Sequence, residues 1–208
     1  MCQKIDVSFF KRLLEMEPSD VCRRSLAEYD ADRMLYSIVA FGKTYRVNPA
    51  TGDIKPAHDP SSAEWAHAPV SVELGLLILF YLLGAQDVPL SGKWVNEFSL
   101  RGGALFFRGP HAIRNSEISD RFGRDIDSFR KVCLKLGAQP VEMGDAAFRF
   151  QILPRIPVLV ILWYGDEEFE ASAKLLMDST IDSHLPLDVI YAMAVELVNL
   201  LIETQGVE

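Results

Sequence analysis

The residues of this chain that are best suited to chemistry are acidic side chains that follow an apolar segment. Val158–Trp163 has the composition of a buried strand, and Asp166, Glu167 and Glu168 come soon after its end. Carboxylates at the end of a strand can bind a hard cation such as Mg²⁺, or can act as a general acid and base. The sequence therefore places its best candidate site directly after this strand.

The same acids also have a structural interpretation. The sequence predicts a helix over Glu167–Leu176, and acidic residues in the first turn of a helix complement its dipole by about 0.3–1 kcal/mol each. Clustered carboxylates mark functional sites only statistically. Both interpretations stay open at the level of the sequence.

Aromatic and basic residues elsewhere in the chain can complete a site around these acids. Trp94 and Trp163 can form the edges of a pocket, and Arg155, between two prolines, can pair with the carboxylates. The ligand-binding candidates are Trp94, Arg155, Trp163, Asp166 and Glu168. The candidates for a metal site, the alternative, are Asp166, Glu168, Asp178 and His184. No nucleophile and base are recognisable, so catalytic residues, cofactors and enzymatic activity are left open.

Composition limits the class of protein and its partners. Of the 208 residues, 49% are hydrophobic, and the longest apolar stretch, Leu74–Leu83, is shorter than the roughly 20 residues that span a bilayer. The three cysteines, Cys2, Cys22 and Cys133, form no C-x-x-C pair, which favours a reducing compartment. We therefore expect a cytoplasmic protein that does not cross a membrane.

Negative charge is concentrated at the end of the sequence. Residues 164–208 carry ten acidic residues and one base, Lys174, a formal charge of −9, whereas the remaining residues sum to +1 of the net −8. Such a segment repels phosphate backbones, so nucleic acid is not an expected partner. A basic surface of a partner protein is the better electrostatic match.

The local patterns predict an α+β fold in which hairpins build one mixed or antiparallel sheet, with helices packed against it. Gly42-Lys43 is typical of the turn of a hairpin, and the last helix shows apolar residues at the spacing of a helix face. The predicted helices are two short ones within 5–29, then 70–85, 113–122, 125–136 and a last one that begins near Leu187. The predicted strands are Met34–Phe41, Thr44–Val47, a short one near Trp94–Phe98, Phe148–Leu153 and Val158–Trp163.

Three groups of residues carry a resemblance to a known family. They are Phe41-Gly42-x-x-Tyr45-x-Val47-x-Pro49-x-Thr51-Gly52, then Leu90-x-Gly92-x-Trp94 with Gly102-Gly103, and Pro154-x-x-Pro157-x₅-Trp163-x-Gly165-Asp166-x-Glu168-Phe169, followed by Asp178 and Leu185-Pro186. The chain resembles the prokaryotic family known as domain of unknown function 3786. The likeness runs from about Tyr29, which implies a helical extension over residues 1–28 and a single α+β domain over 29–204.

The resemblance implies a cytoplasmic protein of anaerobic bacteria or archaea. Relatives are sometimes joined to a four-cysteine iron–sulfur module, which the three cysteines of this chain cannot supply. The family brings no established reaction. The first hypothesis is therefore a small ligand- or cofactor-binding accessory protein of anaerobic metabolism, without catalysis of its own. The alternatives are a metal-dependent enzyme that uses the carboxylate cluster, and a protein-interaction module with an acidic face; the oligomeric state is left open.

Overall fold

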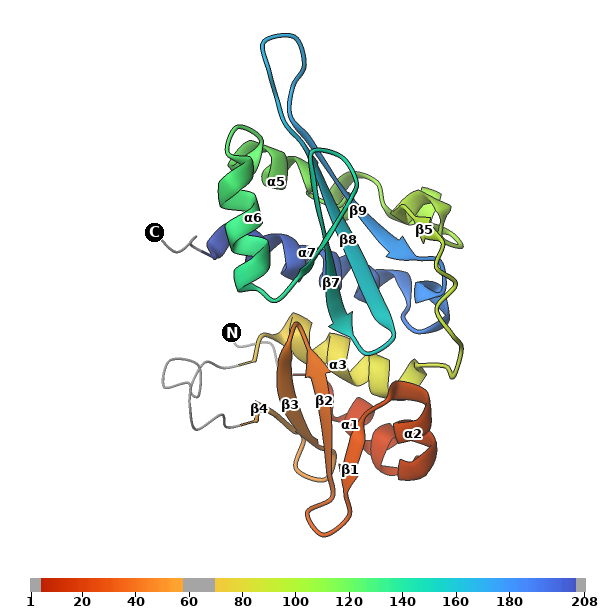
Figure 1. Cartoon of the computed structure of the whole chain (residues 1–208). Coiled ribbons are helices and arrows are strands. Elements are labelled where there is room, and N and C mark those ends of the chain that lie inside the picture. The colour runs from red at the N-terminus through yellow and green to blue at the C-terminus, as the bar shows by residue number, and fades with distance from the viewer. Residues whose placement is uncertain (1–4, 58–69, 205–208) are drawn as a thin grey trace.

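The computed structural model describes residues 5–57 and 70–204, which form two antiparallel sheets with helices packed on them (Figure 1). The first sheet is a meander in the order β1-β2-β3-β4. Its strands are β1 (Glu28–Asp30), β2 (Leu35–Ala40), β3 (Lys43–Asn48) and β4 (Asp53–Pro56).

The second sheet has the order β5-β9-β8-β7-β6. Its strands are β5 (Trp94–Val95), β6 (Gln139–Val141), β7 (Ala146–Leu153), β8 (Ile156–Trp163) and β9 (Ser172–Asp178). The central strand β8 is buried from Ile156 to Leu162, which is why its sequence is apolar at consecutive positions and not at alternate ones. The sheets are joined through a backbone hydrogen bond from Phe41 N–H, after β2, to the carbonyl of Ile152 in β7.

Helix α3 (Val72–Gly84) crosses the molecule between the two sheets and packs against α1, α2 and α7 (Figure 1). Helix α7 (Leu187–Glu203) passes behind β7 and β8 in the same view. The other α-helices are α1 (Val7–Leu14), α2 (Pro18–Ser25), α4 (Gly103–Phe106), α5 (Asn115–Phe122) and α6 (Ile126–Lys135), and the 3₁₀-helices are η1 (Glu97–Ser99), η2 (Gly109–His111) and η3 (Ile181–Ser183). Among the described residues, no helix is both long enough and apolar enough to cross a membrane.

The structure confirms the predicted α+β class. The hairpin of β2 and β3 turns at Phe41 and Gly42, whose φ angles are 49° and 73°. Positive φ angles at both positions are typical of two-residue hairpin turns, because this turn matches the twist of the flanking strands. The helices predicted near 113–122, 125–136 and from Leu187 are also present. The expectation of one sheet was wrong, because the hairpins divide between two sheets.

The helix predicted over Glu167–Leu176 was wrong. Ala173, Leu175 and Met177 are buried while Ser172 and Lys174 are exposed, which is the two-residue period of a strand, and this segment forms β9 beside β8. The acids of residues 166–170 lie in the connection between the two strands. Stabilisation of a helix dipole therefore does not explain them.

Candidate functional site

The connection between β8 and β9, residues 164–171, is here called the β8–β9 tip. It projects beyond the body of the molecule (Figure 1). The backbone N–H groups of Glu168 and Phe169 both donate to Oδ1 of Asp166 at 2.8 Å, and Asp166 N–H donates to the carbonyl of Phe169 at 3.0 Å. Hydrogen bonds from Phe169 and then Glu168 lower the pKa of Asp166. The Asp166 carboxylate therefore closes a tight turn.

The base of the β8–β9 tip is fixed to the turn between α5 and α6. Gly165 N–H donates to the carbonyl of Gly123 at 2.9 Å, and Tyr164 N–H donates to Oδ2 of Asp145 at 2.8 Å. A Cβ atom at Gly123 would overlap Ala171 and the carbonyl of Ser119, so this turn approaches the tip too closely for any side chain at that position. Hydrogen bonds at its base therefore hold the projecting tip in place.

The surface of the β8–β9 tip combines aromatic and acidic groups. Phe169 is 70% exposed and Tyr164 is 48% exposed. Four acids, Asp166, Glu167, Glu168 and Glu170, are exposed around them. Large apolar side chains surrounded by charge on a projecting segment are typical of contact surfaces for other molecules.

A cleft of about 510 Å³ lies between the β8–β9 tip and the α5–α6 turn. Asp166 and Glu168 line it together with Arg121 and Arg124 from the opposite wall. Two of the five predicted ligand-binding residues therefore share one cleft with basic residues that the sequence had not assigned to the site, and Asp120 and Asp125 line it too.

The two tryptophans do not join this cleft. Trp163 lies opposite Ser172 and Trp94 lies opposite Asp178 in the strand register, so both face the same side of the sheet near the two ends of β9. Six residues of strand separate these positions by roughly 20 Å. Lys174 Nζ lies 5.7 Å from the centre of the Trp163 ring. The predicted corner containing both tryptophans is not formed.

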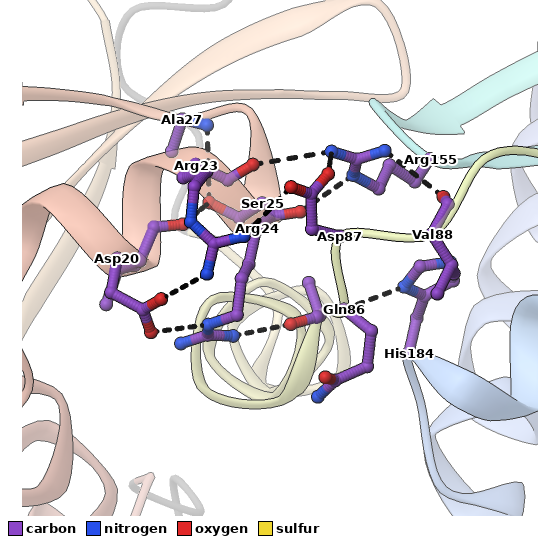
Figure 2. A network of polar contacts seen from close by, with 12 residues as sticks. Asp20, Arg23, Arg24, Ser25, Ala27, Gln86, Asp87, Val88, Arg155 and His184 are labelled. Atoms are coloured by element: carbon purple, nitrogen blue, oxygen red, sulfur yellow. Dashed lines mark hydrogen bonds and ion pairs between the residues drawn. The ribbon is translucent and has the colours of Figure 1, made fainter.

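Arg155 lies in the turn between β7 and β8, at the opposite end of β8 from the acids of the tip. Figure 2 shows its surroundings. Its guanidinium donates to the carbonyls of Arg24 at 2.8 Å, Val88 at 3.2 Å and Arg23 at 3.3 Å. It also pairs with Oδ1 of Asp87 at 2.6 Å. The prediction that Arg155 pairs with the tip carboxylates was wrong: it joins α2, the β7–β8 turn and the segment after α3.

Further ion pairs extend this network around the end of α2 (Figure 2). Asp20 accepts from Arg23 at 2.6 Å and from Arg24 at 2.7 Å, and Arg23 also reaches Asp87 at 2.8 Å. The side chain of Arg24 is 10% exposed and donates through Nη1 to the carbonyl of Ala85. The network satisfies backbone carbonyls and holds elements together, which is a structural task.

Asp178 is 2% exposed at the end of β9. Its two oxygens accept from the N–H and hydroxyl of Ser91, from Gly92 N–H, and from the N–H and hydroxyl of Thr180, at 2.7–3.1 Å. Burial raises the pKa of Asp178, but the hydrogen bonds from Thr180 and Ser91 outweigh burial and lower the pKa to about 2. This carboxylate is saturated by protein donors.

His184 is also 2% exposed, directly after η3. Its Nδ1 accepts from the backbone N–H of Gln86 at 3.2 Å. Asp178 and His184 lie near one end of β9, whereas Asp166 and Glu168 lie beyond the other end. Within residues 5–57 and 70–204, no three His, Cys, Asp or Glu residues are placed to hold a metal ion. The structure therefore does not assemble the four predicted metal ligands.

Sequence reasoning missed several residues that matter in this structure. Asp87 pairs with Arg23 and Arg155 only through tertiary contacts, which the local sequence does not indicate. The pairs of Asp20 with Arg23 and Arg24 have the i, i+3 and i, i+4 spacing of neighbours on a helix, a signal that the sequence did carry. Phe169 did carry a signal, since a large aromatic residue inside the run Asp166–Glu170 is unusual for a purely solvated segment.

Comparisons with known proteins give one match. The model of a family described as "Domain of unknown function (DUF3786)" matches residues 17–200. The match begins within the segment predicted to be a helical extension, residues 1–28, and it includes α2. No curated protein and no solved structure matches this chain.

Proposed function

We propose that this chain, which belongs to the DUF3786 family, is a protein-interaction module that uses the β8–β9 tip to bind a basic surface of a partner protein. The observation that carries the proposal is the exposure of Phe169 at 70% on a projection whose other exposed side chains are mostly acidic. This role corresponds to an accessory protein without catalysis of its own.

The shape of the tip supports a binding role because the tip is ordered before binding. The turn closed by Asp166 fixes the backbone around Phe169, and the bond between Gly165 and Gly123 fixes the base. Binding by a preorganised segment avoids much of the entropy that a flexible loop loses on association. The aromatic side chain can then enter an apolar pocket of the partner as an anchor.

The charge of the tip supports a basic partner. Among the described residues, the four acids of the tip form no ion pair with a basic side chain, although Arg121 and Arg124 line the cleft beside them. Opposite charge on the partner would accelerate association and exclude acidic competitors, and exposed pairs of this kind are screened by salt.

A second candidate function is the binding of a small ligand in the cleft of about 510 Å³ beneath the tip. Asp166 and Glu168 line it together with Arg121 and Arg124, and such a mixture of charges suits a ligand with both positive and negative groups. This candidate retains the accessory ligand-binding role in anaerobic metabolism that the sequence suggested, and it predicts loss of binding on replacing Arg121 or Arg124.

The proposed function is tested by affinity purification of the full-length tagged chain from cells that make it. One variant reverses the charge at Glu167, Glu168 and Glu170 to lysine, and a second is Phe169→Ala. We expect the amount of partner that each variant retains to fall by about tenfold or more relative to the unmodified chain, because anchor residues and complementary charge dominate such interfaces. Partner retained by the unmodified chain should fall as the salt concentration rises.

The matched control reverses three exposed acids elsewhere, Glu15, Glu28 and Glu142, and so applies the same change in net charge. This control should retain the partner. Equal loss in the control and the tip variant, or full retention by Phe169→Ala, contradicts the proposal.

A further inference from the structure

The segment between α3 and β5, residues 85–93, connects the two halves of the molecule without a helix or strand of its own. It is here called the α3–β5 strap. Asp87 and Val88 bind Arg155 in its middle, and Ser91 and Gly92 donate to Asp178 at its far end. Polar contacts therefore hold the strap along most of its length.

His184 holds the near end of the strap at Gln86, next to Ala85, whose carbonyl accepts from Arg24 (Figure 2). The backbone N–H of Gln86 donates to Nδ1 of the imidazole at 3.2 Å, so Nδ1 must carry a lone pair and the proton of the neutral ring must be on Nε2. A doubly protonated ring has no acceptor. Protonation would therefore replace this hydrogen bond by a repulsive contact between two donors, the Nδ1–H of His184 and the N–H of Gln86.

The surroundings of the imidazole strengthen this effect. The ring is buried, Nε2 has no hydrogen-bond partner among the described residues, and Arg155 brings a positive charge from the β7–β8 turn. Tyr81 of α3 contributes only a neutral ring, with its centre 6.2 Å from that of His184. Burial and the nearby charge of Arg155 therefore both destabilise the protonated form of this imidazole.

Carboxylates oppose these effects only in part. Asp178 at the end of β9 and Asp182 of η3 favour the protonated ring, but Asp178 already accepts five hydrogen bonds. Arg12 of α1 lines the same cavity as His184 and adds a further positive charge. Burial first, and then Arg155, lower the pKa of His184 below its ordinary value of 6.5.

We propose that His184 is an acid-sensitive latch for the α3–β5 strap: protonation of its imidazole expels the Gln86 N–H and opens the strap at this end, while Asp178 keeps the far end in place. The latch closes at neutral pH and opens below it. Asp87, the next strap residue, pairs with Arg155 and Arg23, so opening frees the strap directly beside the ion pairs that join the two sheets.

The proposal is tested by nuclear magnetic resonance on the ¹⁵N-labelled full-length chain. The imidazole nitrogens report the tautomer and the titration of His184, and amide hydrogen exchange, corrected for the intrinsic effect of pH, reports the protection of single N–H groups. We expect protection of Gln86 to fall by at least about tenfold across the His184 titration. Protection of Ser91 and Gly92 should persist, since the pKa of Asp178 is about 2.

Two variants isolate the latch. His184→Asn places an amide oxygen near the position of Nδ1 and does not titrate, so Gln86 should stay protected across the same pH range. His111→Asn removes an exposed histidine elsewhere and should behave as the unmodified chain does.

Three results overturn the proposal. They are constant protection of Gln86 across the His184 titration, the same loss in His184→Asn, and simultaneous loss at Ser91 and Gly92. Should His184→Asn fail to fold, the comparison of Gln86 with Ser91 and Gly92 in the unmodified chain decides the question alone.

Discussion

Replacing Arg155 with methionine perturbs the joint between the two sheets most directly. The side chain of Arg155 is 14% exposed and donates to three backbone carbonyls as well as to Asp87. Methionine fills much of the volume but leaves these acceptors without their donor. Loss of one partner of a buried pair typically costs about 3–5 kcal/mol. Because the side chain of Asp87 is 44% exposed and water can solvate it, we expect a loss of about 3 kcal/mol in the free energy of unfolding.

The assay is urea denaturation followed by circular dichroism, with Arg33→Met as the matched control. Arg33 is 70% exposed and reaches Asp30 only at 3.8 Å, so its replacement should change the free energy of unfolding by less than about 0.5 kcal/mol. Arg155→Lys should fall between the two, since an ammonium group cannot reproduce the planar fork of a guanidinium. A loss below about 1 kcal/mol in Arg155→Met would refute the view that this network stabilises the joint.

Two further predictions concern the ends of β9. Asp178→Asn should lower the free energy of unfolding by about 2–3 kcal/mol near neutral pH, because hydrogen bonds to a charged acceptor are lost. In the folded chain the pKa of Asp178 is lowered from 3.8 to about 2. The difference in free energy of unfolding between the variant and the unmodified chain should therefore be complete above pH 3.8 and should shrink as the pH falls toward 2. A difference that stays constant over this range contradicts the assignment. Gly123→Ala should cost about 1–3 kcal/mol through overlap with Ala171, measured by urea denaturation, and Ala171→Gly should partly restore stability; additive losses in the double variant would contradict the proposed contact.

Hydrophobic patterns in the sequence predicted the strands and helices whose buried side chains are consecutive or follow the period of a helix. The apolar run of β8 and the helical spacing of α7 were both recognisable, because each element packs one continuous set of side chains into the core. β9 was missed because it follows an acidic run that favours a helix start. Its two-residue period over Ser172–Met177 was present in the sequence.

The candidate site was predictable only where its residues are close in sequence. Asp166 and Glu168 do share a cleft, since one turn presents both. Arg155 bonds to the carbonyl of Arg24, which is 131 residues away, and a contact of this kind depends on how two sheets meet. The separation of Trp94 from Trp163 likewise follows from strand order, which the sequence does not state.

Site-specific photocrosslinking tests the central claim, that the β8–β9 tip is the docking element, most directly. A photoreactive phenylalanine analogue is placed at Phe169, or at Leu105 of α4, which is 81% exposed away from the tip, in cells that make the full-length chain. We predict that position 169 gives one dominant crosslinked protein and that this crosslink disappears when Glu167 and Glu170 are changed to lysine. Position 105 should not crosslink to the same protein. The same crosslinked proteins from both positions, or a crosslink at 169 that survives the charge reversal, would contradict the claim.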